Sequence, residues 1–572
     1  MNNSLTMSLE TKSNWNIPEK LKSKDLVKYL LEKRDIKDAE DFLNPSLDNI
    51  PSYEKLFNAK KAAKKILKFV KAGKKIAIHG DYDSDGICAT SVLWDFLYRD
   101  LAKYLDTKID VVPYIPSRID QGYGLTESSL NDVIDLGADL LISVDCGVRD
   151  KIILNQYVEE KKLDFVITDH HQPPEDIATD LNYILVHQMY PGKEYPDREI
   201  CGTTVAFLLV QAIKAEAGME TEVNENTKGL DLVALSTVTD MMPLVGVNRI
   251  FVTYGLKQLQ KGTRLGFRML ALRAGIEPKD IDTYHLGYVI GPRINAAGRI
   301  GSPLEAVKLL VSTDEKQCQE IANDLNDVNF SRQKMTSDIL ENAKMNIVET
   351  DNLIFVLGNG WHEGIIGLVA GKLGEEFYKP VLVATNNEGI IKGSARSIKG
   401  FNITKTLEKY EMYLERFGGH ELAAGFTAKL DTIEEFRTEI TNYANETLTE
   451  ENLTRDVKID LNLDADDVSY ALINSMKALE PYGYGNPKPL IYLEDLIVVK
   501  KYIMGKEKSH MKLMVKGTGV ELLNIVLFNC FDDTEKVNEN DSIDVIGYPS
   551  VNVWNGNETI QFQAKEWRRH IS

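Results

Sequence analysis

Cysteine is scarce in this chain, with five residues among 572. They are widely spaced, odd in number and include no Cys-x-x-Cys pair; they are Cys88, Cys146, Cys201, Cys318 and Cys530. This spacing argues against a disulfide framework and predicts reduced thiols. Cys146 follows an aspartate, but no feature of the sequence supplies it with an activating base, so a nucleophilic role has no support.

Long apolar runs are also missing. Although 43% of the residues are hydrophobic, no run approaches the roughly 20 residues of a membrane span. The first residues, Met-Asn-Asn-Ser-Leu-Thr, have neither the basic region nor the apolar stretch of an export signal. We therefore expect a soluble, cytoplasmic protein with no membrane partner. A length of 572 residues allows about four domains.

Net positive charge is absent as well, since the formal charge at pH 7 is −19. Phosphate contacts need local positive charge, so any nucleic-acid surface must be confined to a part of the molecule. The densest basic segment, Lys60–Lys75, has the pattern of an amphipathic helix with a solvated face. We favour this interpretation, and contact with DNA stays open as the alternative.

Three short apolar runs in the first third of the chain each end in acidic or imidazole side chains. Such runs are typical of buried parallel strands, whose carboxyl ends meet at one edge of an open α/β sheet. The side chains at these ends are His79, Asp81, Asp83, Asp85, Asp145, Asp169, His170 and His171. This much negative charge in one place needs water or cations to compensate it. Oxygen ligands mixed with imidazole suit Mn²⁺ or Mg²⁺ better than Zn²⁺, so the sequence predicts a divalent-metal site.

The segment Asp81–Gly86 also fits the beginning of a calcium-binding loop. That loop needs a glutamate six residues after its glycine, but no acidic residue follows Gly86 before Asp95. The calcium loop is therefore rejected. Each motif alone is weak evidence, and the metal site is inferred from the three strand ends taken together.

The order of several motifs resembles a known family. Asp81-Tyr-Asp-Ser-Asp-Gly86, Val144-Asp-Cys-Gly147, Asp169-His-His171 and Thr237-Val-Thr-Asp240 resemble the DHH phosphoesterase superfamily. Further motifs are Gly291-Pro-Arg-Ile-Asn-Ala-Ala-Gly-Arg299, Gly301-Ser-Pro303, Gly393-Ser-Ala-Arg-Ser397 and Gly418–Gly425. Over nearly the whole chain they resemble the RecJ family of single-strand-specific exonucleases. Two departures concern local turns: Cys146 stands where the family often has a small polar residue, and Val186–Pro191 replaces an Asn-Pro turn.

The pattern of strands and helices, together with this resemblance, predicts an α/β protein with a small β-barrel at its end. We expect an N-terminal cap at 1–50 and a DHH metal-binding catalytic domain with a doubly wound parallel sheet at 51–310. Residues 311–349 contain no glycine or proline and predict a long connecting helix. A smaller α/β DHH-associated domain that binds substrate is expected at 350–448, and a nucleic-acid-binding β-barrel of the OB-fold type at 449–572.

The resemblance implies a metal centre with two divalent ions, Mn²⁺ or Mg²⁺, about 3.5–4 Å apart. Its ligands would be His79, Asp81, Asp83, Asp85, Asp145, His170 and Asp240. Asp145 would bridge the ions, and His171 would contact the phosphate, which makes these two the catalytic residues. Two alternatives stay open: His79 as a core histidine at a strand end, and Asp240 as a helix-terminal carboxylate.

The resemblance also implies contacts to the DNA. Guanidinium groups bind phosphate oxygens in a bidentate manner, and glycine lets a backbone approach closely. The implied substrate-binding residues are Arg118, Arg293, Asn295, Arg299, Ser394, Arg396, Gly418, Gly419 and His420. For any single arginine, a surface salt bridge is the alternative. Tyr482, Tyr484 and Trp554 could stack on bases or belong to the core of the barrel.

We therefore expect a metal-dependent exonuclease that degrades single-stranded DNA from 5′ to 3′ and releases 5′-mononucleotides in recombination and repair. The direction follows from the resemblance alone. A phosphodiesterase for short oligonucleotides or cyclic dinucleotides would use the same chemistry, but it needs no C-terminal barrel. A catalytically silent single-strand-binding scaffold would not need clustered acids that repel DNA. The expected partners are single-stranded DNA, a single-strand-binding protein and a helicase, and the chain is expected to be a monomer.

Overall fold

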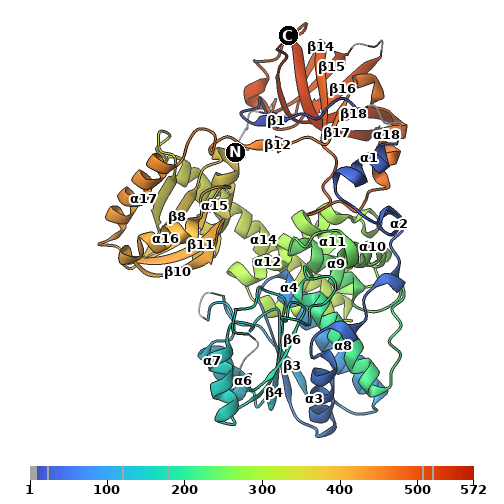
Figure 1. The fold of residues 1–572 in the computed structure, drawn as a ribbon, viewed down its shortest axis with the longest axis vertical. Coiled ribbons are helices and arrows are strands. Elements are labelled where there is room, and N and C mark those ends of the chain that lie inside the picture. Colours follow the sequence, from blue (N-terminus) through green and yellow to red (C-terminus); the bar gives the residue numbers. More distant parts are fainter. Residues whose placement is uncertain are drawn as a thin grey trace.

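The computed structural model describes residues 9–21, 25–118, 121–177, 181–505, 508–517, 519, 521–554 and 556–571, with the side chain of Trp554 outside this description. Figure 1 shows three folded parts: a large α/β part, a smaller α/β part beside it, and a β-barrel above. The prediction that the chain has no export signal was based on its first six residues, and these lie outside the described ranges. No helix in the described ranges has the length and apolarity that a bilayer span requires. All five cysteines are free and buried, as the sequence predicts.

The large α/β part contains a parallel sheet with the strand order β3-β2-β4-β5-β6. Its strands are β2 (Ile76–Gly80), β3 (Val111–Tyr114), β4 (Leu140–Val144), β5 (Asp164–Asp169) and β6 (Ile184–His187). The three apolar runs of the sequence are β2, β4 and β5, which are neighbours in the sheet. Their carboxyl ends therefore meet at one edge, as predicted.

Helices cover both faces of this sheet. One face packs against α3 (Ala59–Lys71), α4 (Ser84–Asp95) and α8 (Gly202–Ala217), and the other against α6 (Glu127–Asp135) and α7 (Lys151–Glu159). Residues of β2 alternate between the two cores, since Ile76 and Ile78 join the first and Ala77 the second. The basic segment forms α3, whose alanines, Ile66, Leu67 and Val70 are buried, while its lysines other than the half-buried Lys65 are exposed. The amphipathic interpretation of this segment is confirmed.

A layer of helices follows the sheet and connects it to the rest of the chain. Its members are α9 (Leu230–Thr239), α10 (Gly246–Lys261), α11 (Leu265–Arg273), the π-helical turn η5 (His285–Ile290), α12 (Gly291–Ile300), α13 (Pro303–Val311) and α14 (Glu315–Lys344). The expected connecting helix is α14, capped by the Asp314 side chain. It packs against α11 and α12 on one side and against α15 of the smaller α/β part on the other.

The smaller α/β part has a five-stranded sheet with the order β10-β11-β9-β8-β7. Its strands are β7 (Ile354–Asn359), β8 (Val381–Asn387), β9 (Ile390–Arg396), β10 (Leu414–His420) and β11 (Ala423–Lys429), and its helices are α15 (Glu363–Phe377), α16 (Ile403–Lys409) and α17 (Ile433–Thr447). Only β7 and β8 are parallel. The two edge strands are β7 and β10, and β10 carries the Gly-Gly-His motif.

The C-terminal part is a closed five-stranded barrel, because β14 pairs with both β15 and β17. Its strands are β14 (Ile491–Met504), β15 (His510–Lys516), β16 (Leu522–Leu527), β17 (Ser542–Trp554) and β18 (Asn557–Arg569), with β13 (Leu461–Leu463) and α18 (Tyr470–Lys477) beside them. The barrel expected from the sequence is confirmed.

The described part of the N-terminal segment belongs with the barrel in space. Strand β1 (Asn14–Asn16) pairs with β12 (Asp456–Lys458), while α1 (Leu26–Lys33) and α2 (Ala39–Leu43) follow. Leu30, Leu31 and Phe42 join the hydrophobic core of the barrel. The remaining short helices are η1 (Leu47–Asn49), η2 (Tyr53–Lys55), η3 (Phe96–Leu101), α5 (Ala102–Tyr104), η4 (Pro278–Asp280), η6 (Glu411–Tyr413), η7 (Ala465–Asp467) and η8 (Phe531–Asp533).

Candidate metal centre and adjoining arginine cavity

The acidic loop after β2 is shaped by its own backbone. The Asp83 carboxylate caps α4 and accepts hydrogen bonds from the backbone N–H groups of Asp85 (2.9 Å) and Gly86 (3.1 Å). A Cβ at Gly86 would lie 2.4 Å from the backbone oxygen of Asp81, so only glycine fits there. The spacing of the motif thus brings the carboxylates of one short loop to the edge of the sheet.

Asp145 occupies a strained backbone position at the end of β4. Its φ of 63° lies in the left-handed region, which aspartate and asparagine tolerate better than most residues. The close neighbour is Gly202, where a Cβ would come within 2.8 Å of the Asp145 Cβ. Strain of this kind persists where the surrounding structure fixes it, often at functional sites. Asp145 is 1% exposed, so the strain holds a carboxylate inside the protein.

His170 presents a lone pair to three carboxylates. Its Nδ1 lies 3.0 Å from the carbonyl oxygen of Ile200. A carbonyl oxygen only accepts, so Nδ1 carries the proton and Nε2 is unprotonated. Nε2 lies 3.1 Å from Oδ1 of Asp145, 3.5 Å from Oδ2 of Asp85 and 3.6 Å from Oδ2 of Asp240. Burial lowers the pKa of His170, which favours the neutral ring.

Four ligand-type atoms of this region are buried and have no hydrogen-bond partner among the described residues: His79 Nε2, Asp145 Oδ1, His170 Nε2 and Asp240 Oδ2. An unsatisfied buried polar group costs about 1–3 kcal/mol. Three sets of ligand atoms each lie within 4.8 Å of one another: Asp85 with His170 and Asp240, Asp81 with Asp83 and Asp145, and Asp145 with His170 and His171. The residues present therefore fit a divalent-cation centre, and Asp145 belongs to two of the three sets.

The protonation of the carboxylates leads to the same conclusion. Burial and the neighbouring carboxylates raise the pKa values of Asp81, Asp83 and Asp145, and they raise that of Asp240 to about 9. A divalent cation supplies the opposite charge that would keep these groups ionised. The site is therefore built for a cation.

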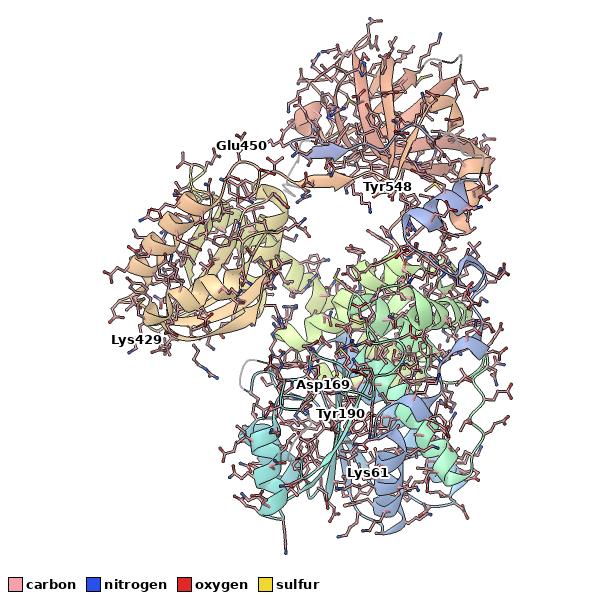
Figure 2. All side chains as sticks on the ribbon, viewed as in Figure 1. Lys61, Asp169, Tyr190, Lys429, Glu450 and Tyr548 are labelled. Atoms are coloured by element: carbon pink, nitrogen blue, oxygen red, sulfur yellow. The ribbon has the colours of Figure 1, made fainter. Side chains whose placement is uncertain are left out.

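Asp169 lies behind the centre and holds the two histidines. It stands at the end of the sheet nearest to the helical layer (Figure 2). Its carboxylate accepts from the backbone N–H of Val148 (2.9 Å), from those of His170 (2.7 Å) and His171 (3.1 Å), and from Nδ1 of His171 (2.8 Å). Burial lowers the pKa of His171, but the hydrogen bond to Asp169 and the charges of Asp169, Asp240 and Asp85 together outweigh burial and raise that pKa to about 9. His171 can therefore donate a proton at neutral pH.

His79 is fully buried at the end of β2, with Nδ1 3.6 Å from the Cys146 thiol. Burial lowers the pKa of His79 to about 4, so its ring is neutral. Its free Nε2 suits a ligand, but His79 belongs to none of the three ligand sets among the described residues. Both interpretations of this residue stay open.

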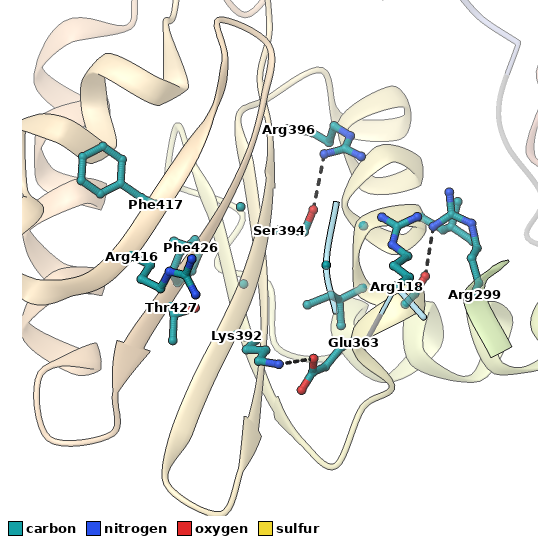
Figure 3. A pocket seen from close by; sticks show the side chains of 17 residues that line it. Arg118, Arg299, Glu363, Lys392, Ser394, Arg396, Arg416, Phe417, Phe426 and Thr427 are labelled. Atoms are coloured by element: carbon teal, nitrogen blue, oxygen red, sulfur yellow. Dashed lines mark hydrogen bonds and ion pairs between the residues drawn. The ribbon is translucent and has the colours of Figure 1, made fainter. Parts of the chain in front are cut away.

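A cavity of about 590 Å³ lies between the large and the smaller α/β parts (Figure 3). Its polar lining comes from both: Arg118, Arg299, Glu363, Lys392, Ser394, Arg396, Arg416 and Thr427. The Arg118 guanidinium lies 5.0 Å from the ring centre of Tyr82, within the acidic loop. Burial and then the charges of Arg118, Arg332 and Arg396 lower the pKa of Arg299 to about 10. Arginines gathered in this way can bind an anion beside the metal centre.

Among the predicted substrate contacts, Arg118, Arg299, Ser394 and Arg396 line this cavity. Two others have protein partners instead. Oδ1 of Asn295 accepts from the backbone N–H (2.7 Å) and hydroxyl (2.8 Å) of Ser84, so Asn295 supports the acidic loop. Arg293 donates to the carbonyl of Val289 (2.7 Å) and to Asn326 (3.2 Å).

Gly418, Gly419 and His420 are exposed on the edge strand β10 and do not line the cavity. Tyr482 packs against the barrel core and donates its hydroxyl to the Met476 carbonyl, so the core interpretation applies to it. Tyr484 is 60% exposed. The side chain of Trp554 lies outside the described part of the chain.

The sequence analysis missed three residues of this region. Lys392 and Arg416 line the cavity, and each lies one or two positions before a glycine motif that was recognised. The Tyr123 hydroxyl lies 3.1 Å from Nδ1 of His171. Proximity to the glycine motifs could have identified the first two, whereas no local signal marks Tyr123.

Comparisons with known proteins agree with this geometry. Residues 75–237 match the DHH family, N-terminal domain, residues 350–446 the DHHA1 domain, and residues 459–566 the RecJ OB domain. The chain is 34% identical over 560 residues to the single-stranded-DNA-specific exonuclease RecJ of Bacillus subtilis (strain 168), covering 96% of this chain and 69% of the relative. RecJ of Haemophilus influenzae is 30% identical over 525 residues, covering 88% of this chain and 89% of the relative.

A solved structure has the same overall fold. The crystal structure of RecJ in complex with Mn²⁺ from Thermus thermophilus matches with a TM-score of 0.81 and 27% sequence identity. The match covers 98% of this chain and 80% of that one. The same protein in complex with Mg²⁺ matches with a TM-score of 0.76 and 26% identity, over 98% of this chain and 79% of that one.

Proposed function

This chain belongs to the RecJ family and is a single-stranded-DNA-specific exonuclease, and we propose that it cuts with two divalent ions, Mn²⁺ or Mg²⁺. The observation that carries the proposal is the set of four buried, unpartnered ligand atoms beside a cavity rich in arginine. In this proposal the strand runs from the cavity across the metal centre, is cut from its 5′ end, and loses 5′-mononucleotides.

We assign the ligands from the groups that lie together. Asp85, His170 and Asp240 would hold one ion and Asp81 and Asp83 the other. Asp145 would be shared, because it lies in one ligand set with Asp81 and Asp83 and in another with His170. When bound, such ions lower the pKa of a water molecule and stabilise charge on the phosphate and the leaving oxygen. His79, with its free Nε2, is proposed as a further ligand.

The chain's own side chains would do the remaining work. His171, protonated at neutral pH, would donate a hydrogen bond to a phosphate oxygen at the exposed edge of the centre, where its side chain is 41% exposed. Arg118, Arg299 and Arg396 would bind the terminal phosphate, whose charge offsets that of the exposed Arg118 and of the half-buried Arg299 and Arg396. Holding the terminal phosphate at a fixed place beside the centre would determine which bond is cut.

The cellular setting is part of the same proposal. We place the enzyme in the cytoplasm, in recombination and repair, acting as a monomer on strands provided by a helicase or a single-strand-binding protein. The closed barrel supports a long single strand over a short oligonucleotide or cyclic dinucleotide, because such barrels bind extended strands.

A digestion experiment tests the proposed function. A single-stranded oligonucleotide labelled at either end is incubated with the chain in Mn²⁺, in Mg²⁺ or in chelator. We expect metal-dependent release of mononucleotides from the 5′ end, and no release with Asp145→Asn, which keeps the left-handed backbone position. Loss of label first from the 3′ end, or digestion in chelator, would contradict the proposal.

A further inference from the structure

Two tyrosines form an exposed stacked pair that the proposed mechanism does not use. Tyr284 and Tyr288 are 61% and 75% exposed. Their ring centres lie 5.2 Å apart with an angle of 25° between the planes. Single exposed aromatic residues are ordinary, but two nearly parallel rings open to solvent form a flat apolar surface.

Helix α12 relates this pair to the metal centre. Arg299 near its C-terminal end lines the arginine cavity, and Asn295 in its middle holds Ser84 of the acidic loop. Tyr288 precedes its N-terminal end, in η5. At 1.5 Å per residue, about 16 Å separate Tyr288 from Arg299 along the helix. Along α12, Asn295, which supports the acidic loop, therefore lies between the cavity residue Arg299 and the tyrosine pair.

Contacts at the other end of the centre support this placement. A Cβ at Gly291 would lie 2.4 Å from the side chain of Thr239, so the beginning of α12 packs directly beside the residue before Asp240. Met241, on the other side of Asp240, is 65% exposed. The segment that carries the pair thus packs on the end of α9 that supplies a ligand.

Hydrogen bonds connect the segment next to the tyrosine pair with the turn that precedes the barrel. The Thr283 hydroxyl donates to the carbonyl of Tyr482 (2.6 Å), and the Leu244 N–H donates to that of Tyr484 (2.7 Å). These bonds fix the turn before the barrel against the helical layer, which is the side of the large α/β part nearest to the barrel (Figure 1). The exposed ring of Tyr484 therefore stands on the same route, beyond the pair.

We propose that Tyr284 and Tyr288 are a base-stacking platform for the part of the strand that has not yet reached the metal centre, with Tyr484 next along the path to the barrel. The inference rests on the proposed function. Every base has a flat face, so stacked rings hold a strand without regard to sequence, as a general exonuclease needs. A strand is favoured over a protein segment because the pair is continuous with the centre and its rings are nearly parallel, as successive bases are.

Binding measurements with the full chain test the platform. In an Asp145→Asn background that prevents cutting, affinity is measured for a long 5′-phosphorylated oligonucleotide and for a 5′-phosphorylated dinucleotide, which reaches only the cavity and the centre. We expect Tyr288→Ala and Tyr284→Ala each to weaken long-strand binding by about 5-fold to 100-fold and to leave dinucleotide binding unchanged. Tyr288→Phe keeps the ring and should bind as the parent does.

Tyr104→Ala is the matched control. Tyr104 is 50% exposed on α5, at the far end of the helical segment that begins at Ser84, and its hydroxyl binds the Gly218 carbonyl. This variant should not alter either affinity. Unchanged dinucleotide binding also shows that a tyrosine variant is folded.

An abasic scan assigns the base. A set of long oligonucleotides is made, each lacking the base at one position, and the affinity of each is measured for the parent chain and for Tyr288→Ala. If a base stacks on Tyr288, removing that base should weaken binding to the parent chain but should not weaken binding to Tyr288→Ala any further. Three outcomes would overturn the platform. The first is unchanged long-strand binding in both alanine variants, the second is the same loss of affinity with Tyr288→Phe as with Tyr288→Ala, and the third is that the effects of base removal and of Tyr288→Ala on affinity add at every position. If one of these outcomes is found while the native chain degrades single strands, only the platform is rejected. If the native chain does not degrade single strands, the proposed function itself is rejected.

Discussion

Nε2 of His170 lies 3.1 Å from Oδ1 of Asp145, and neither atom has a hydrogen-bond partner among the described residues. Nδ1 of His170 is committed to the Ile200 carbonyl, so the facing nitrogen is an acceptor, as is the carboxylate oxygen. When the carboxylate is ionised, these two buried acceptors repel each other. A divalent cation at this place would be bound by both atoms, and their repulsion would be replaced by attraction to the cation.

The first prediction concerns the stability of the metal-free chain. In chelator, Asp145→Asn should raise the free energy of unfolding by about 1 kcal/mol, because without a cation the Asp145 carboxyl must either be buried with its charge or take up a proton on folding, and asparagine does neither while it tolerates the same backbone position. In Mn²⁺ the order should reverse, since the native centre gains about 2.7 kcal/mol at a hundredfold excess over Kd. Thermal unfolding in both conditions measures this. The same order of stabilities in chelator and in Mn²⁺ would be incompatible with a metal centre at Asp145.

The second prediction concerns Asn295. Its oxygen is occupied by Ser84, so Asn295→Ala should lower kcat by about 10-fold to 100-fold through a displaced acidic loop. Affinity for single-stranded DNA in chelator should stay within about twofold of the native value. Steady-state kinetics and fluorescence anisotropy separate the two effects. A large loss of affinity with kcat preserved would restore Asn295 as a direct DNA contact, as the resemblance implied.

The strand-end residues could be predicted from the sequence because a short apolar run marks each buried strand and acidic or imidazole side chains follow directly after it. An apolar run of a parallel strand has one carboxyl end, and all such ends meet at one edge, so Asp145 and His170 could be placed together without coordinates. The barrel and the connecting helix were likewise foreseen from alternation and from helical spacing. These features depend on local periodicity, which the sequence carries directly.

Other features depend on which way a side chain points or on contacts between distant segments. A motif names Asn295 and Arg293 but does not say that they turn toward Ser84 and Val289. Arg416 enters the cavity because β10 lies at the edge of its sheet, a matter of strand order. Packing of Leu30 into the barrel joins the two ends of the chain and leaves no local signal.

The third prediction concerns the packing of α12 on the acidic loop. A Cβ at Gly298 would lie 2.2 Å from the backbone oxygen of Tyr82, which a flexible side chain cannot relieve. Gly298→Ala should therefore destabilise the chain by about 1–3 kcal/mol and lower kcat, because the helix must move away from the loop. Gly301→Ala is the matched control: its nearest neighbours lie at 3.5 Å, and we expect a change within about 0.5 kcal/mol. Equal effects of the two variants in urea unfolding would show that the close approach has no consequence.

The last prediction concerns the arginine cavity and the end of the strand that it binds. A terminal phosphate carries more charge than one within the chain, so a cluster of guanidinium groups should favour 5′-phosphorylated over 5′-hydroxyl oligonucleotides. Arg396→Ala should remove about 1.5–3 kcal/mol of this preference, the usual contribution of a hydrogen bond to a charged group, and should leave binding of the 5′-hydroxyl strand nearly unchanged. Arg437→Ala, on α17 and away from the cavity lining, is the control for a general loss of positive charge. Competition binding with the two oligonucleotides measures the preference. An equal loss for both strands would assign Arg396 to an internal phosphate, and a preference for a 3′-phosphate would reverse the polarity of the enzyme.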